Sequence, residues 1–328
     1  MSVTQEDLEA SLSRLRETVA DPRAGILGPR SIAWHIGADL ALFLGGGRAA
    51  LLQLAHPHVA HAVDDHSRTR ADVVGRFQRT FRNVFAMVFG DLDAAFAAAR
   101  RVHAIHTRVH GTLPAAAGSW PAGTPYHANQ IESLRWVHTT LVDTTIAVRE
   151  LIDGPLPISI KDAYMIELHR FGALFGIPAT ELPASWSEHV AYVDSMIEGG
   201  CLAVVPCAYE MAGFLIGRHS PAIHVGRHSP AIHGRRGSQP MLGRTAELVT
   251  YALLPPRLAA EFGLRGAPRR TRAALAAFAA VYRRIPRAAV TIPACDEAQR
   301  RLDGRAPGKW SAWTERQLFG LARRTTGN

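Results

Sequence analysis

Apolar residues recur at spacings of three and four along most of the chain, which is the spacing of one face of an α-helix. The clearest pattern lies within residues 71–89, where the apolar face consists of Val74, Phe77, Phe81, Val84, Phe85 and Val88. The opposite stripe carries Arg76, Arg79, Thr80 and Asn83. We predict an amphipathic helix whose polar stripe either faces solvent or lines a pocket for anionic groups or a bound oxidant.

The same spacing, interrupted by proline and glycine, predicts further helices. They cover residues 91–110, 130–152, 159–175, 187–196, 245–253, 271–282 and 313–322, and Ser31 is a candidate N-cap for an earlier helix. Runs of alternating β-branched residues are almost absent, so a substantial sheet is not expected. The sequence therefore predicts an all-α fold, with a helical extension over residues 1–24 and a single large helical domain over residues 25–328.

Composition bounds the class of protein. A chain of 328 residues that is 47% hydrophobic and 20% charged can bury a large core. Its net charge of +9 comes largely from arginine-rich pieces such as Arg269-Arg270 and Arg283-Arg284. Few aromatic residues are interleaved with these arginines for base stacking, which argues against nucleic acid as a partner. Solvated helix faces are the first interpretation, and a peripheral contact with a membrane surface is the second.

The cysteines and the apolar runs indicate in which cellular compartment the protein is expected. Cys201, Cys207 and Cys295 form no CxxC pair, and a disulfide framework is not expected from an odd number. The first 21 residues carry charges throughout and hold no apolar run typical of a secretory signal. The longest apolar stretch, residues 40–55, is interrupted by three glycines and Arg48. We expect a cytoplasmic protein.

One short repeat stands out. The sequence GRHSPAIH at residues 217–224 is repeated at residues 226–233. Its four histidines could bind a metal, but glycine and proline every few residues predict no fixed coordination geometry. We interpret the segment as a tandem duplication within a surface-loop insertion over residues 217–240.

Histidines concentrate in the first half of the chain. On a helix over residues 91–110, His103, His106 and His110 fall within roughly 60° of arc, with His106 nearest the apolar seam and the other two further out. A neutral imidazole in a dry space suits an axial bond to haem iron, and a structural histidine is the alternative. A non-haem metal site is a further option, built on this cluster or on His56, His58 and His61.

Several short blocks point to a family when they are taken together. They are Gly45-Gly46-Gly47-Arg48 running on to His56-Pro57, Asp65-His66-Ser67, Arg76-x-x-Arg79-Thr80, Val88-Phe89-Gly90, Val102-x-x-Ile105-His106-x-x-Val109-x-Gly111, Tyr126-x-Ala128, Trp136-Val137-His138 and Leu141-Val142-Asp143. Their order and spacing over roughly residues 25–200 resemble the rubber oxygenase (latex clearing protein) and MpaB family. The resemblance implies an all-helical fold around a haem b that uses O2 against a small hydrophobic substrate, such as an isoprenoid or other unsaturated lipid.

The resemblance also implies roles for individual residues. His106 stands at the position of the proximal iron ligand, with His110 beside it, and Arg76 and Thr80 match pocket positions. Arg79 stands where latex clearing enzymes carry a lysine that can ligate the iron from the distal side. Because a guanidinium is permanently protonated, Arg79 is a very poor ligand, so we expect a five-coordinate iron or one that carries water or another residue.

Two further departures affect function. Residues 55–63 hold no glutamate, where rubber oxygenases place a catalytic base, and His58 or His61 could substitute. The expected absence of export makes a terpenoid, polyprenyl or fatty-acyl chain a better substrate than polyisoprene. His138 and Asp143 share one predicted helix and are either a supporting imidazole–carboxylate pair or a buried polar pair that serves the fold. A haem carrier or sensor without turnover and a haem-free lipid-binding protein are the alternatives from other classes.

Overall fold

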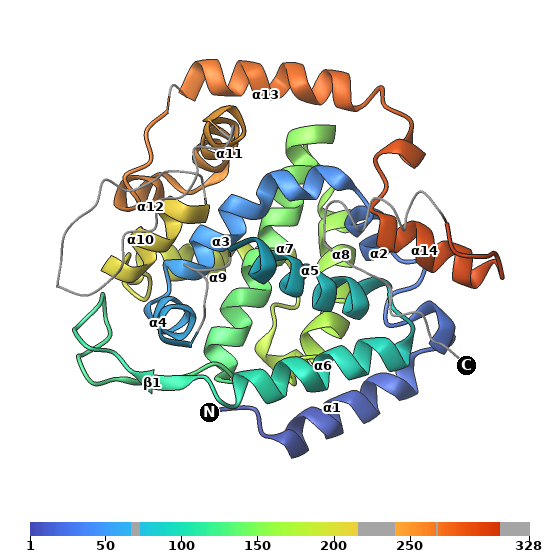
Figure 1. Cartoon of the computed structure of the whole chain (residues 1–328), viewed down its shortest axis with the longest axis horizontal. Helices are drawn as coiled ribbons and strands as arrows, with labels where there is room; N and C mark the ends of the chain where they lie inside the picture. Colours follow the sequence, from blue (N-terminus) through green and yellow to red (C-terminus); the bar gives the residue numbers. More distant parts are fainter. Residues whose placement is uncertain (67–72, 216–239, 267, 309–328) are drawn as a thin grey trace.

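A computed structural model describes residues 1–66, 73–215, 240–266 and 268–308 (Figure 1). The duplicated segment 217–233 and the helix expected over residues 313–322 lie outside these ranges. Within them the chain forms fourteen α-helices and one two-stranded antiparallel sheet. The all-α prediction is therefore confirmed, and no helix of the described residues is long and apolar enough to cross a membrane.

The helices are numbered in the order of the sequence. In chain order they are α1 (Gln5–Thr18), α2 (Ile32–Gly37), α3 (Gly46–Leu54), α4 (Pro57–His66), α5 (Val73–Phe89), α6 (Leu92–His106), α7 (Ile131–Asp153), α8 (Ile158–Ala173), α9 (Trp186–Glu198), α10 (Pro206–Leu215), α11 (Pro240–Leu253), α12 (Pro256–Glu261), α13 (Pro268–Tyr282) and α14 (Pro293–Leu302). The strands are β1 (His110–Thr112) and β2 (Pro125–His127), and the 3-10 helices are η1 (Pro22–Ala24), η2 (Leu40–Gly45), η3 (Ala179–Glu181) and η4 (Arg287–Ala289).

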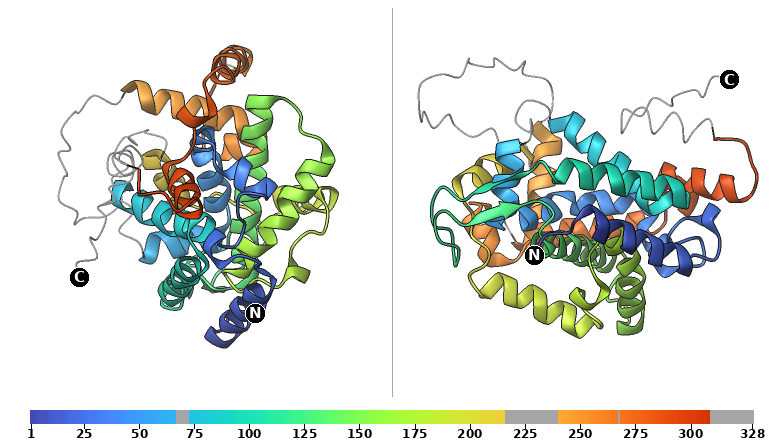
Figure 2. Two further views of the ribbon diagram at one scale, coloured as in Figure 1. Left: turned by 90° about the vertical axis from the view of Figure 1, so that its right-hand side faces the viewer. Right: turned by 90° about the horizontal axis from the view of Figure 1, so that it is seen from below.

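The helix α7 runs through the middle of the molecule, and α3 and α8 pack against it (Figures 1 and 2). The largest core cluster joins α1, α6, α7 and α8 through residues such as Leu8, Phe96, Ile146 and Phe171. The N-terminal helix thus buries its apolar face in the main core. A second cluster, around Trp136, joins α3, α4, α10 and α12.

Local signals placed several boundaries correctly. Ser31 caps α2, because its side chain accepts the Trp34 backbone N–H at 3.1 Å. The amphipathic helix expected over residues 71–89 is present as α5. The helix expected to reach His110 ends at His106 instead, because the next residues pair with a second segment, His110 with His127 and Gly111 with Tyr126. Placing His110 on the same helix as His106 was therefore wrong.

The three glycines before α3 have different surroundings. A Cβ on Gly47 would lie 2.1 Å from the Thr250 hydroxyl of α11, whereas a Cβ on Gly46 would meet nothing within 4 Å. Gly46 already has helical φ and ψ angles of −56° and −42°. The close approach of α3 to α11 therefore requires glycine at position 47 and not at position 46.

We expect Gly47→Ala to lower the free energy of unfolding by about 1–3 kcal/mol, because the new methyl group must displace a buried side chain. Gly46→Ala is the matched control and should raise it by about 0.5–1 kcal/mol, since alanine reduces the freedom of the unfolded chain. Urea unfolding followed by far-UV circular dichroism measures both. Equal effects of the two substitutions would contradict this account of the α3–α11 contact.

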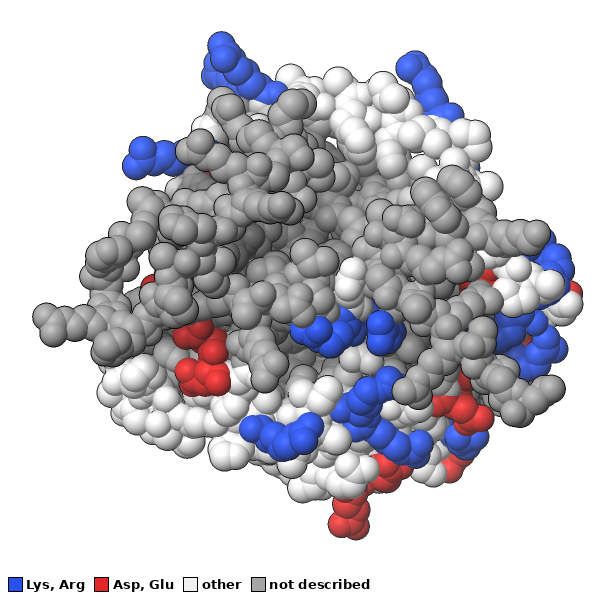
Figure 3. Space-filling view, in the orientation of Figure 1, with Lys and Arg blue, Asp and Glu red and all other residues white. Residues whose placement is uncertain are grey.

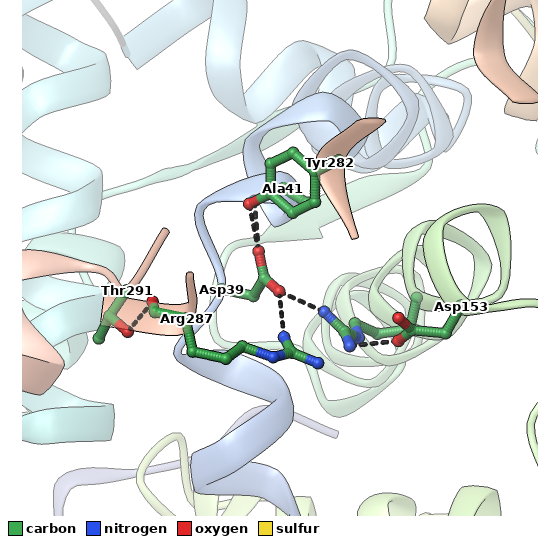
Figure 4. A network of polar contacts seen from close by, with 7 residues as sticks. Asp39, Ala41, Asp153, Tyr282, Arg287 and Thr291 are labelled. Carbon is green, nitrogen blue, oxygen red and sulfur yellow. Dashed lines mark hydrogen bonds and ion pairs between the residues drawn. The ribbon is translucent and has the colours of Figure 1, made fainter. Parts of the chain in front are cut away.

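The buried carboxylate of Asp39 binds residues from the middle and from the C-terminal part of the described chain (Figure 4). The Asp39 side chain is 2% exposed and lies between η2, α7, α13 and η4. Its two oxygens accept hydrogen bonds from the Ala41 backbone N–H at 2.9 Å, the Tyr282 hydroxyl at 2.5 Å, the Arg287 guanidinium at 2.9 Å and the Arg149 guanidinium. Arg149 is also buried and pairs in addition with Asp153. Asp39 therefore neutralises a buried guanidinium and satisfies donors from three distant segments.

Candidate functional site

The hairpin of α5 and α6 brings together the residues expected around a cofactor. The two helices are joined through Gly90 and Asp91 and pack along each other (Figure 1). The start of α5, with Arg76, Arg79 and Thr80, therefore lies at the same end of the hairpin as His106, the last residue of α6. Arg79 and Thr80 are exposed and His106 is half-buried, while the side chain of Arg76 lies outside the described side chains.

The burial order of the α6 histidines differs from the expectation. His103, expected to lie further out than His106, is buried, and its Nε2 donates to the Val3 carbonyl at 3.0 Å. The N-terminal segment covers this side of α6, with Arg100 bound to Glu9 at 2.7 Å beside it. Helix periodicity could not show this, because the covering residues are about a hundred positions away in the sequence. His103 has a structural role, whereas His106 remains at the edge of the hairpin.

Two buried histidines, His56 and His58, lie at the start of α4, which packs against β1 and β2. The Nδ1 of His56 accepts the His58 backbone N–H at 3.3 Å. The Nε2 of His56 is buried, with no hydrogen-bond partner among the described residues. Both ring nitrogens of His58 are buried as well, and the Gln130 side chain lies near enough to act on the pKa of His58. The His58 ring packs against Trp120 at 4.3 Å between centroids. Because buried polar atoms almost always have a partner, these nitrogens are candidates for contact with water or a bound molecule.

Ring contacts and hydrogen bonds lead from these histidines to His110 on β1. The Tyr126 ring lies 6.5 Å from the rings of both His58 and His61, and its hydroxyl donates to Asp65. The next residue, His66, donates from Nε2 to the carbonyl of His110 at 2.9 Å. His110 itself is exposed on β1, four residues after His106. The α4 histidines therefore lie against the β-hairpin, which begins four residues after His106 in the chain.

Burial determines the protonation states of the histidine and tyrosine side chains in this region. It lowers the pKa of His56 to about 3, helped by the neighbouring His58, and it also lowers the pKa of His58. Burial, followed by the hydrogen bond and charge of Asp65, raises the pKa of Tyr126. At neutral pH the two imidazoles are therefore neutral and can accept a proton, while the tyrosine keeps its proton as a donor.

The buried neutral histidines predict a loss of stability in mild acid. Burial lowers the pKa of His138 to about 4, as it lowers that of His56 to about 3, whereas both titrate near 6.5 in the unfolded chain. The unfolded state therefore binds more protons below pH 6.5, so stability is complete above that value and falls as the pH decreases. At pH 5 each of these two histidines should lower the free energy of unfolding by about 2 kcal/mol relative to its value at pH 7.5.

Urea unfolding at pH 7.5 and at pH 5 tests this pH dependence. His56→Gln should reduce the difference between the two free energies of unfolding by about 2 kcal/mol, because glutamine does not titrate. His35 is exposed, so His35→Gln is the control and should leave the difference unchanged. A pH dependence identical in all three proteins would contradict the assignment to buried histidines.

A second polar group lies between α3, α7 and α9. Arg48 binds Asp143 at 2.6 Å, and the other oxygen of Asp143 lies 3.3 Å from the Nε2 of His189. Although burial by itself raises the pKa of Asp143, the hydrogen bond from His189 and the charge of Arg48 together lower it. The imidazole that serves Asp143 is thus His189, whereas His138 donates to the Leu168 carbonyl at 3.0 Å. His138 and Asp143 share α7 without forming a pair.

Sequence reasoning missed some of these residues for different reasons. Arg48 carried a usable signal, because it is a charge within an apolar helix and needs a counter-charge, whereas Asp143 was already a candidate. Trp120 and His189 carried none, because their roles depend on contacts far apart in the sequence. In the described part of the chain, no three histidine, cysteine, aspartate or glutamate side chains converge in a way that could hold a metal ion.

Comparison with known proteins adds one match. The family model for the catalytic domain of the "ER-bound oxygenase mpaB/B'/Rubber oxygenase" matches residues 34–284. The match includes α3 to α6, the β-hairpin and α7, and therefore the whole region described above. Searches of curated proteins and of solved structures return no match.

Proposed function

Because the chain belongs to the MpaB and rubber oxygenase family, whose members are oxygenases, we propose that it is a haem b-dependent oxygenase acting on an unsaturated isoprenoid or lipid-like substrate with O2. The observation that carries the proposal is the buried Nε2 of His56, which has no hydrogen-bond partner among the described residues, beside the buried ring of His58. Both histidines lie in the matched domain, as does His106.

The residues present fit a haem. A porphyrin supplies four of the iron ligands itself, so a single protein imidazole is enough, and His106 offers one that is half-buried at the end of α6. The arginines at the facing end of α5 suit propionates, which guanidinium groups bind through charge-assisted hydrogen bonds. When bound, the haem would supply an iron centre for O2.

The surrounding side chains would complete the site. In this proposal His106 is the proximal ligand, Arg76 and Thr80 line the pocket, and Arg79 lies on the propionate or distal side. His110 lies beside the proximal ligand on β1. Since a guanidinium ligates metals poorly, a distal bond from Arg79 is not part of the proposal.

His58 is our candidate for the base that removes a proton from the substrate. Its ring nitrogens are buried, and burial lowers the pKa of the imidazole, which is therefore neutral at pH 7. His61 is less suited, because its Nδ1 already lies 4.0 Å from the Sγ of Cys207. His58→Gln should therefore reduce turnover while leaving haem binding in place.

The spectrum of protein purified from haem-supplied cells tests the cofactor. A Soret band that shifts after addition of dithionite and CO is expected for a histidine-ligated haem b. Oxygen consumption with squalene, geranylgeraniol and oleate then tests turnover, with mass spectrometry of the products. Oxygenated or cleaved products would support the oxygenase.

Two results would contradict the proposal at different levels. Protein that remains colourless, with the haem supply verified by a known haem protein expressed in parallel, would remove the haem and its chemistry. Lipid that co-purifies with such colourless protein would favour a lipid-binding protein. Reversible binding of O2 and CO, without substrate-dependent oxygen consumption, would favour a carrier or sensor.

A further inference from the structure

The outer helix α13 lies within the most one-sidedly charged segment of the chain. Residues 262–295 contain no aspartate or glutamate. They contain seven arginines, which are Arg265, Arg269, Arg270, Arg272, Arg283, Arg284 and Arg287. Within the described residues, two of the seven have side-chain partners: Arg283 binds the Ile152 carbonyl at 2.9 Å and Arg287 binds Asp39. Most of this positive charge is therefore not neutralised by the described part of the chain.

One face of α13 anchors the helix and the opposite face is open. Thr271, Leu275 and Ala279 are buried toward α11 and α7. Figure 1 shows α13 along the outer edge of the molecule. The helical repeat of 3.6 residues places Arg270, Ala277 and Val281 on the side away from the buried residues, and all three are exposed. Arg284 is also exposed, two residues beyond the end of the helix.

The open face is apolar in its middle and basic at its ends. Val281 is 61% exposed, and alanines fill most of the remaining outward positions, while Phe278, which is 41% exposed, lies on the flank of the helix. Figure 3 shows Lys and Arg side chains at both ends of the edge that α13 forms, with uncharged side chains between them. Arginines can reach phosphate groups beside the helix while short apolar side chains contact the boundary between headgroups and acyl chains.

We propose that α13 docks the protein on a bilayer that contains anionic phospholipids, with its axis parallel to the membrane surface. Charge complementarity identifies this partner, because the segment offers arginines without a compensating acid. The exposed apolar side chains favour a lipid surface as the partner. A purely electrostatic partner such as nucleic acid would not need to cover them. The proposal is independent of the haem and of turnover.

Flotation with lipid vesicles tests the proposal on the full chain. The protein should float with vesicles of phosphatidylcholine mixed with phosphatidylglycerol, and not with vesicles of phosphatidylcholine alone. Added salt should weaken the binding. Arg270→Gln combined with Arg284→Gln should weaken it by about 30-fold, as expected for two arginines that each contribute roughly a factor of five.

Matched controls separate a local effect from a general one. Arg14→Gln combined with Arg30→Gln makes the same change in net charge at exposed positions elsewhere and should leave binding unchanged. Val281→Asp should weaken binding by at least about tenfold. Ile158→Asp introduces the same charge at a site of similar exposure, 58%, on α8 and should have little effect. Thermal unfolding verifies that each variant is folded.

Three outcomes would overturn the proposal. One is the absence of flotation with the anionic vesicles. Another is an equal loss of binding in the α13 variants and in the matched controls, which would mean that overall charge, not this helix, is responsible. The last is retention of RNA with no binding to vesicles, which would assign the arginines to nucleic acid instead.

Discussion

The variant His106→Gly is expected to purify without the haem Soret band and without substrate-dependent oxygen consumption. The reason is that the proposed site offers the iron one protein ligand, at the end of α6, and glycine removes it. Glycine is tolerated at this position better than within the helix, because helix ends lack part of the hydrogen-bond ladder. Addition of imidazole to the haem-supplied variant should restore a histidine-like spectrum.

The imidazole rescue distinguishes a ligand from a structural histidine. A histidine that only stabilises the fold would not be replaced by a free small molecule. His35→Gly is the control, since His35 is exposed on α2, and it should retain both the band and the activity. An unchanged Soret band in His106→Gly would contradict the proposed ligand while leaving the haem itself in place.

The variant Asp39→Ala should lose about 3–5 kcal/mol of the free energy of unfolding. It leaves the buried Arg149 with Asp153 alone and removes the acceptor for Tyr282 and Arg287. For a domain of this size, such a loss corresponds to a decrease in melting temperature of roughly 6–20 °C. Thermal unfolding followed by circular dichroism measures the change.

Trypsin digestion gives a second readout for Asp39→Ala. The segment after α13 carries Arg283, Arg284 and Arg287, and its attachment to the body depends in part on Asp39. Cleavage there should become faster in Asp39→Ala. Glu9→Ala is the control, because its pair with Arg100 is half-exposed and should contribute less than about 1 kcal/mol. Equal destabilisation by the two substitutions would contradict a special role of the buried network.

Regular periodicity was sufficient to predict most of the helical fold. The apolar face of α5 and the Ser31 cap of α2 are local signals, and local signals determine where helices form. The end of α6 could not be predicted in the same way. It depends on the pairing of Gly111 with Tyr126, which are separated by a loop whose course the sequence pattern does not reveal.

In the candidate site, too, the positions of residues on helices could be predicted, whereas contacts between segments far apart in the sequence could not. Hydrophobic periodicity placed Arg76 and His106 on neighbouring helices, and the structure brings their backbone positions to one end of a hairpin. The burial of His103 by Val3 and the pairing of Asp143 with His189 were not predictable, because each joins segments that no periodicity relates. The roles of His106, Arg76, Arg79, Thr80 and His110 stay predictions until the cofactor is tested.

The Asp39 network also has a consequence for synthesis on the ribosome. The two partners of the Asp39–Arg287 pair are 248 residues apart in the chain. At about 5–20 residues per second, the aspartate is made roughly 12–50 s before its last partner emerges. During that interval the carboxylate can remain hydrated, and η2 and α7 lack the segment that later covers them. The contact of Asp39 with Arg287 can therefore form only after nearly all of the described chain has been synthesised.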